Sequence, residues 1–329
     1  MARALIVGGS GQIGQAAAPR LARDGWDVTI AARNGGLDGF QYVRLDRENA
    51  GEFAAAADGY DVVVDVVPYT LDDGRQLASL AGRVGSVIVV STAAVYGWGT
   101  DETPLPVPVP ERHPTVDPGD DDYPTRKRAI ELMVLEADEL RATVVRPAAI
   151  HGRGSRHVRE WYFVKRALDG RRPVVLARRG ESRFHTTSVA NLAEVIALAS
   201  RRPRARVVNC GDPDAPTALA IAREVGRALG HEWTEVLLPG PEEGSVGDHP
   251  WNAPRPFVLD MTGATLQLGY LPVTTYGRAV GDTVEWVVEA TRGRDWRDVL
   301  TGSTYLEPMF DYAAEDRYLA VLQGVEADR

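Results

Sequence analysis

Cysteine, lysine and long apolar runs are scarce in this chain of 329 residues, and each scarcity excludes a class of protein. The single cysteine, Cys210, cannot form an internal disulfide, so we expect a reducing, cytoplasmic location. No apolar run approaches the roughly 20 residues of a membrane span. The six histidines are scattered without metal-ligand spacing. We therefore expect neither a membrane partner nor a metal.

The charge balance also narrows the choice of partners. Acidic residues outnumber basic ones, and the net charge of −9 is spread over mixed signs. A nucleic-acid partner would require a basic face, so we expect none. With 44% hydrophobic residues, the chain can bury the core of one large domain or of two linked ones.

The scarcity of lysine is the most informative of the three. The chain has 37 basic residues, but only Lys127 and Lys165 are lysines. Lys127 follows Tyr123 by four residues, which places both side chains on one face of a helix. An ammonium near a phenol favours the phenolate, so we predict a lowered pKa for Tyr123 and a general acid/base there. The alternative is a surface helix on which the two residues meet by chance.

The N-terminal residues predict a dinucleotide-binding unit. A short strand at 4–7 leads into glycines at positions 8, 11 and 14, and a helix at 15–24 and a strand at 26–32 follow. Glycines at this junction let the backbone approach a pyrophosphate at the helix N-terminus. We expect cofactor contacts from Gly8, Ser10, Gly11, Gln12, Ile13 and Gly14. The alternative is an ordinary tight turn.

The cofactor type depends on the end of the second strand. An NAD site usually has a carboxylate there for the ribose 2′-hydroxyl, whereas this chain has Arg33. An arginine suits a 2′-phosphate, so NADP is favoured over NAD. Alternatively, Arg33 is a solvated loop residue or stacks on the adenine.

Asp46 ends a third strand at 41–45. There it is placed either to accept from the adenine amino group or to cap a helix at 48–57. Further apolar strands at 61–67, 86–90 and 143–147, with a helix at 72–82, predict an α/β fold with a Rossmann, doubly wound parallel sheet. Thr92 follows the fifth strand, where hydroxyls face the dinucleotide crevice. The proline-rich segment 103–118 is read either as a lid or as a surface loop.

Four motifs in this order carry a family resemblance. They are Gly8-x-x-Gly11-x-x-Gly14, Ser91-Thr92-Ala93-Ala94-Val95-Tyr96-Gly97, Tyr123-x-x-x-Lys127 and Arg146-Pro147-Ala148-Ala149-Ile150-His151-Gly152. The chain resembles the extended short-chain dehydrogenases/reductases, the NAD(P)-dependent epimerase/dehydratase family typified by UDP-galactose 4-epimerase. The resemblance implies that Thr92, Tyr123 and Lys127 are catalytic. It also implies that the backbone from Pro147 to Ile150 contacts the nicotinamide end.

The same resemblance implies a domain division and a substrate class. We expect an NAD(P)-binding domain over 1–150 with a strand at 205–211, and a smaller, mostly helical substrate-binding part over 151–204 and 212–329. His151 stands where the family usually has a tyrosine, and Arg183 lies near the position of an arginine that binds a nucleotide-sugar diphosphate. Both are candidate substrate contacts, and the implied substrate is a nucleotide sugar or similar polar metabolite.

Three functions stay open on the sequence alone. The first is an epimerase or dehydratase that removes and returns a hydride while it retains its cofactor. The second is a net NADPH-dependent ketoreductase of a natural-product intermediate, which Arg33 favours. The third is a dinucleotide-binding regulator without turnover, which the presence of Thr92, Tyr123 and Lys127 disfavours. A homodimer is compatible with each.

Overall fold

The structure is a computed structural model that describes residues 1–100 and 102–327. The chain forms two compact units. Unit 1 comprises Met1–Ile150, Thr187–Pro213 and Val258–Thr274, and unit 2 comprises His151–Thr186, Asp214–Phe257 and Thr275–Arg329. The sequence assigned residues 187–204 and 258–274 to the substrate-binding part, whereas they pack within unit 1.

The strands are short and separated by helices over most of the chain. They are β1 (Arg3–Val7), β2 (Asp27–Ala32), β3 (Gln41–Arg44), β4 (Val62–Asp65), β5 (Val87–Val90), β6 (Ala142–Pro147), β7 (Ala149–His151), β8 (Pro173–Leu176), β9 (Thr186–Ser188), β10 (Arg206–Cys210) and β11 (Thr234–Leu237). β7 and β9 form a two-stranded sheet, as do β8 and β11.

The helices are α1 (Gln12–Arg23), α2 (Ala50–Ala57), α3 (Leu71–Ala78), α4 (Tyr123–Leu135), α5 (Trp161–Leu168), α6 (Val189–Ser200), α7 (Ala218–Leu229), α8 (Thr262–Leu268), α9 (Tyr276–Thr291), α10 (Trp296–Val299) and α11 (Tyr312–Ala327). Short 3₁₀ helices are η1 (Ala93–Tyr96), η2 (Ala177–Gly180) and η3 (Thr304–Phe310). Within the described residues, no helix is long and apolar enough to cross a membrane.

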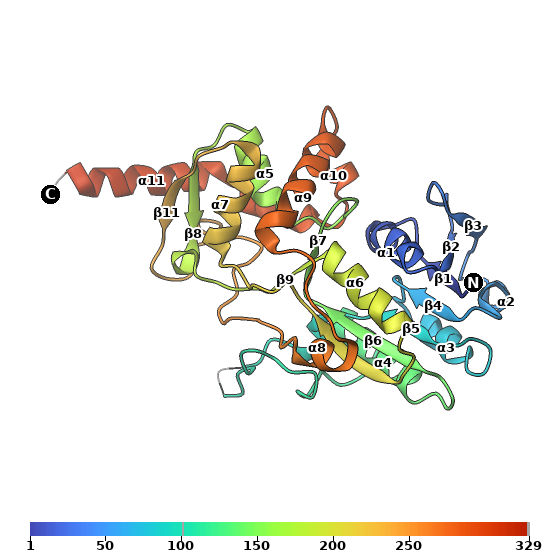
Figure 1. Cartoon of the computed structure of the whole chain (residues 1–329). Helices are drawn as coiled ribbons and strands as arrows, with labels where there is room; N and C mark the ends of the chain where they lie inside the picture. Colours follow the sequence, from blue (N-terminus) through green and yellow to red (C-terminus); the bar gives the residue numbers. More distant parts are fainter. Residues whose placement is uncertain (101, 328–329) are drawn as a thin grey trace. The chain divides into compact units, whose positions relative to one another are not determined.

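Unit 1 is built on a seven-stranded sheet with the order β10-β6-β5-β4-β1-β2-β3, in which every pairing is parallel (Figure 1). Because parallel strands end at one edge, Val7, Ala32, Asp65, Val90 and Pro147 mark a common carboxyl edge. Ligands of open parallel sheets bind outside that edge. The predicted Rossmann sheet is confirmed.

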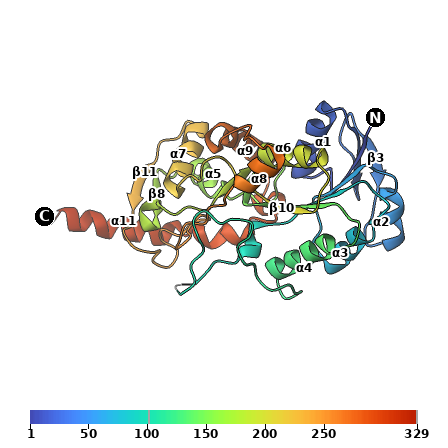
Figure 2. The same ribbon diagram turned by 60° about the horizontal axis from the view of Figure 1, so that its bottom comes forward.

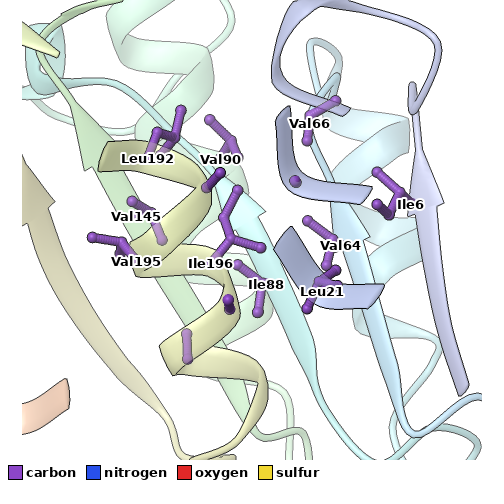
Figure 3. Close-up of a cluster of buried hydrophobic side chains, with 14 of the residues drawn as sticks. Ile6, Leu21, Val64, Val66, Ile88, Val90, Val145, Leu192, Val195 and Ile196 are labelled. Carbon is purple, nitrogen blue, oxygen red and sulfur yellow. The ribbon is translucent and has the colours of Figure 1, made fainter. Parts of the chain in front are cut away.

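Helices cover both faces of this sheet (Figure 2). One face carries α1 and α6, whose apolar side chains meet Ile6, Val64 and Ile88 (Figure 3). The other face carries α2, α3 and α4, which pack against Leu5 and the other strand residues that point to this face. Alternation along each strand sends successive side chains to opposite cores, which explains why these strands are apolar throughout.

Unit 2 packs α5, α7 and α9 around an aromatic core and adds the parallel β8–β11 pair. Its core includes Trp161, Phe163 and Trp251, with the last two rings stacked at 5.6 Å. The sequence predicts a last helix over about residues 278–291, whereas α10 and α11 follow it in the structure. The missed α11 is fastened by a buried ion pair, in which Arg166 lies 2.6 Å from Glu315. Irregular aromatic spacing concealed this helix.

Candidate functional site

The glycine turn after β1 requires glycine for steric reasons. Gly8 has a φ of +77°, and a Cβ there would lie 2.8 Å from the Val67 side chain. A Cβ on Gly14 would lie 2.3 Å from the Cα of Gly9, so the first turn of α1 packs directly on the loop. The turn therefore brings backbone close to whatever binds above it.

The start of α1 is suited to an anion. Gly11 is its N-cap, and among the described residues no side chain caps this end. Gln12 and Ile13 open the helix, and the carbonyl of Ser10 accepts a 2.8 Å hydrogen bond from Gln15. A helix N-terminus presents backbone N–H groups and the positive end of the dipole. A dinucleotide pyrophosphate fits this turn.

Arg33 and Asp46 are both exposed, and each follows a strand at the outer part of the carboxyl edge. The Asp46 side chain accepts from the N–H of Glu48 at 3.3 Å, but the N-cap of α2 is Asn49. The capping alternative for Asp46 was therefore wrong, because a turn over residues 46–49 precedes the helix.

The helix that carries the tyrosine and the lysine begins at Tyr123. Asp122 is its N-cap and accepts from the N–H of Thr125 at 2.9 Å, while the Thr125 hydroxyl accepts from the Asp122 N–H at 3.1 Å. This reciprocal capping box fixes Tyr123 as the first helical residue and places Lys127 one turn later.

Lys127 is buried at the carboxyl ends of β4 and β5. Its side chain is 3% exposed, and its Nζ donates to the carbonyls of Val90 at 2.7 Å and Pro68 at 3.0 Å. Burial lowers the pKa of Lys127 to about 8, although the nearby carboxylate of Asp65 opposes that shift. The ammonium also lies 5.9 Å from the centroid of the Tyr123 ring.

The predicted lowering of the Tyr123 pKa was wrong. Partial burial of the phenol raises its pKa to about 12, and the neighbouring Tyr69 acts in the same direction. A side-chain hydrogen bond from Thr92 lowers the pKa but does not cancel the rise. Lys127 directs two of its ammonium protons to backbone carbonyls and not to the phenol. Tyr123 is therefore a protonated acid at neutral pH.

Thr92 and Pro147 extend this group along the carboxyl edge. Thr92 is the N-cap of η1, and its hydroxyl accepts from the N–H of Ala94 at 3.2 Å. Pro147 ends β6 opposite Cys210 of β10, and Ile150 packs at the border of the core beneath. Within unit 1, the structure thus brings together the edge residues that the sequence named.

The two candidate substrate residues belong to unit 2. His151 is buried with its ring 4.8 Å from that of Tyr276, and the exposed Arg183 donates to the carbonyl of Ala215. As a group, the described residues contain no His, Cys, Asp and Glu cluster that could hold a metal.

Of the polar residues behind the site, the sequence indicated Asp65, as a charge near the end of an apolar strand, but not Glu131 or Arg47. Glu131 is fully buried on α4 and accepts from Ser91 at 2.6 Å and from Arg146 at 2.9 Å. Asp65 is also fully buried and pairs with Arg47 at 2.8 Å. The sequence signal was the charge of Asp65 in an otherwise apolar strand, which indicates one member of the Asp65–Arg47 pair and not the other.

Comparisons with known proteins agree with this geometry. Residues 4–211 match the sequence model of the NAD dependent epimerase/dehydratase family. Among curated proteins no match was found. Similar solved structures include UDP-glucuronic acid 4-epimerase from Bacillus cereus with UDP-glucuronic acid and NAD, which has a TM-score of 0.68, 16% identity and coverage of 87% of this chain and 99% of that one.

Two further structures have the same architecture. The dTDP-glucose 4,6-dehydratase of Bacillus anthracis with NAD has a TM-score of 0.69 and 16% identity, over 91% of this chain and 100% of that one. A UDP-galactose 4-epimerase has a TM-score of 0.67 and 22% identity, over 88% and 99%. At these identities the likeness establishes a shared fold.

Proposed function

Because the chain belongs to the NAD-dependent epimerase/dehydratase family of enzymes, we propose that it oxidises or reduces a secondary alcohol or ketone of a nucleotide sugar or similar polar metabolite. The observation that carries this proposal is the grouping of Thr92, Tyr123 and Lys127 at one sheet edge. The glycine turn lies at the same edge, two strands away through β4. The nucleotide sugars bound by structures of the same fold support the substrate class.

Several residues at this edge would bind the dinucleotide. Gly8, Gly11 and Gly14 would hold a dinucleotide pyrophosphate, and Pro147 and Ile150 would contact its nicotinamide end. When bound, the nicotinamide would accept and return a hydride. Arg33 leads us to favour a 2′-phosphate, and hence NADP.

The protein's own groups handle the proton. Tyr123 donates its proton to the substrate oxygen in the reductive direction and takes one back in the oxidative direction. Thr92 donates a hydrogen bond to the same oxygen. The Lys127 ammonium, when charged, stabilises the phenolate that proton transfer leaves on Tyr123.

Bound nicotinamide distinguishes the candidate reactions. Purified protein is denatured, and the released dinucleotide is identified and counted by mass spectrometry. Tight, stoichiometric NAD supports an epimerase or dehydratase, whereas NADPH that exchanges with solvent supports a reductase. Absence of binding to NAD, NADP and both reduced forms in titrations would refute the proposal.

A substrate screen tests the chemistry itself. UDP-glucose, UDP-galactose, UDP-glucuronic acid and dTDP-glucose are each incubated with the loaded protein, and products are separated by chromatography. His151 and Arg183 are our proposed substrate contacts in unit 2, and His151→Ala and Arg183→Ala should raise KM for any active sugar nucleotide with little change in dinucleotide affinity.

A further inference from the structure

The loop after β4 contacts two parts of the proposed site. We call residues 66–70 the β4 loop. A Cβ on Gly8 would lie 2.8 Å from the side chain of Val67. The Pro68 carbonyl accepts the 3.0 Å hydrogen bond from Lys127. The loop thus lies against both the glycine turn and the lysine.

Three side chains outside the loop fix its backbone. The N–H of Val67 donates to Asp65 at 2.9 Å, and the Val67 carbonyl accepts from Arg47 at 3.3 Å. The N–H groups of Tyr69 and Thr70 donate to Asp73 at 2.7 and 2.8 Å. Since proline has no N–H and the Pro68 carbonyl is taken by Lys127, these contacts account for nearly all the loop's central polar groups.

Arg47 joins the two carboxylates. Its guanidinium lies 2.8 Å from Asp65 and 2.6 Å from Asp73, and the Arg47 side chain is 14% exposed. Gln76 donates to the Arg47 carbonyl at 2.7 Å, and the guanidinium lies over the Phe53 ring at 5.1 Å. We call Arg47, Asp65 and Asp73 the Arg47 clamp. A planar guanidinium can bridge two carboxylates in a fixed geometry, which a lysine cannot.

We propose that the Arg47 clamp is a positioning device that holds Lys127 at the catalytic edge through the β4 loop. The proposal deepens the proposed function, because it rests on Lys127 acting at that site. Arg47 comes from the turn after β3, Asp65 from the end of β4 and Asp73 from the first turn of α3. The clamp therefore couples three separate segments to one side chain.

The charges around Lys127 set the direction of the expected change. Burial lowers the pKa of Lys127, three carboxylates raise it, and Arg47 lowers it. The groups that face Lys127 are Asp65 on β4, Asp73 on α3, Glu131 on α4, Arg47 before α2 and the rings of Tyr69 and Tyr123. Replacing Arg47 by methionine removes a positive charge and loosens the loop, so both effects raise the pKa of Lys127 from about 8.

The scarcity of lysine makes a direct test possible without a substrate. Acetic anhydride labels deprotonated amines, and peptides containing Lys127 and Lys165 are resolved by mass spectrometry. Lys165 lies in unit 2, pairs with Asp169 and serves as the internal reference. Labelling rates are measured on the free protein from pH 6 to 10.5 for the wild type and for Arg47→Met. The matched control is Arg75→Met on α3, whose ion pair with Asp72 is exposed.

The clamp predicts two changes confined to Lys127. In Arg47→Met its labelling rate at the alkaline plateau rises about tenfold, equivalent to ~1.4 kcal/mol of easier opening, and its midpoint moves to higher pH. Lys165 and the Arg75→Met protein stay at wild-type values. Circular dichroism and the melting temperature establish that each variant is folded. If Arg47→Met does not fold, Asp73→Asn, which keeps the size of the side chain, is used. Its plateau rate should rise less than in Arg47→Met, and its midpoint should move to lower pH, because the Asp73 carboxylate raises the pKa of Lys127.

An unchanged plateau and midpoint for Lys127 in a folded clamp variant would overturn the proposal. Equal acceleration of Lys127 and Lys165 would overturn it too, because it would indicate general loosening. Dinucleotide titrations run in parallel keep the two proposals apart: failure to bind any dinucleotide refutes the proposed function, whereas the labelling comparison decides the role of the clamp in either case.

Discussion

Removing one oxygen atom, in the variant Tyr123→Phe, should abolish turnover while leaving the fold and dinucleotide affinity nearly intact. The Tyr123 ring is 43% exposed at the start of α4, so phenylalanine can occupy the same position. Thr92 is a side-chain partner that affects its hydroxyl by hydrogen bonding. Loss of one such bond costs about 1 kcal/mol of unfolding free energy. The melting temperature should therefore fall by only a few degrees.

The expected effect on rate is far larger. A positioned general acid or base contributes roughly 10²- to 10⁴-fold, which corresponds to about 3–5.5 kcal/mol in the activation barrier. The contrast between this loss and the small loss of stability is the signature of a group that acts on the reacting atoms. Tyr305→Phe is the matched control, because Tyr305 is 41% exposed and belongs to unit 2.

The pH dependence follows from the raised pKa of Tyr123, about 12, and the lowered pKa of Lys127, about 8. Reduction of a ketone needs the phenol, which is present below pH 12, and the Lys127 ammonium, which is lost as pH rises through about 8. Reduction should therefore decline above pH 8. Oxidation needs the phenolate, whose fraction rises about tenfold per pH unit below the tyrosine pKa, so alkaline pH should favour oxidation.

The assay is single-turnover hydride transfer, followed by nicotinamide absorbance with whichever sugar nucleotide the screen identifies. Dinucleotide affinity is measured by quenching of intrinsic tryptophan fluorescence in the same preparations. Near wild-type turnover in folded, dinucleotide-bound Tyr123→Phe would refute the assigned role. A large loss of affinity with unchanged turnover of the bound fraction would instead assign Tyr123 to cofactor binding.

Three further substitutions test neighbouring parts of the site. Arg33→Ala should raise the Kd for NADPH roughly ten- to a hundredfold, the value of contacts to a charged phosphate, and leave the Kd for NADH unchanged in fluorescence titrations. Thr92→Val should lower kcat by about 10²-fold, as loss of a donor to a reacting oxygen does, whereas Thr92→Ser should retain most activity. Gly14→Ala should destabilise the protein by ~1–3 kcal/mol and weaken dinucleotide binding in thermal melts and titrations, because its Cβ would lie 2.3 Å from the Cα of Gly9. Gly281→Ala on α9 is its control, since a Cβ there meets nothing within 4 Å, and it should not weaken dinucleotide binding.

The main sheet could be predicted because its signals are local. Strand β4 reads as an apolar run up to its last residue, Asp65, and α4 has a capping aspartate and a proline in its first turn. In the C-terminal half, local signals predict helices where α5, α7 and α9 lie, but two long-range contacts have no such signal. The β8–β11 pairing joins segments about 60 residues apart, and α11 depends on the buried Arg166–Glu315 ion pair. Neither long-range contact has a periodic signature.

The positions of the site residues could also be predicted, but their electrostatics could not. The four-residue spacing correctly placed Tyr123 and Lys127 one turn apart. It could not predict that Lys127 would donate hydrogen bonds to the carbonyls of Pro68 and Val90. Nor could it predict that Tyr69 would lie close enough to raise the pKa of Tyr123. A pKa depends on burial and on charges from other segments, and spacing within one helix contains neither.

Glu131 illustrates why the support of a site is harder to infer than the site. It follows Lys127 by one helical turn, so from the sequence it is an ordinary helix residue. In the structure its carboxylate accepts hydrogen bonds from Ser91 at 2.6 Å and from Arg146 at 2.9 Å. Ser91 precedes Thr92, and Arg146 precedes Pro147, so one buried charge ties three predicted motifs to each other. Breaking such a pair leaves a buried charge uncompensated, at a cost of about 3–5 kcal/mol. The motifs are separate in the chain, and only packing gives them a common anchor.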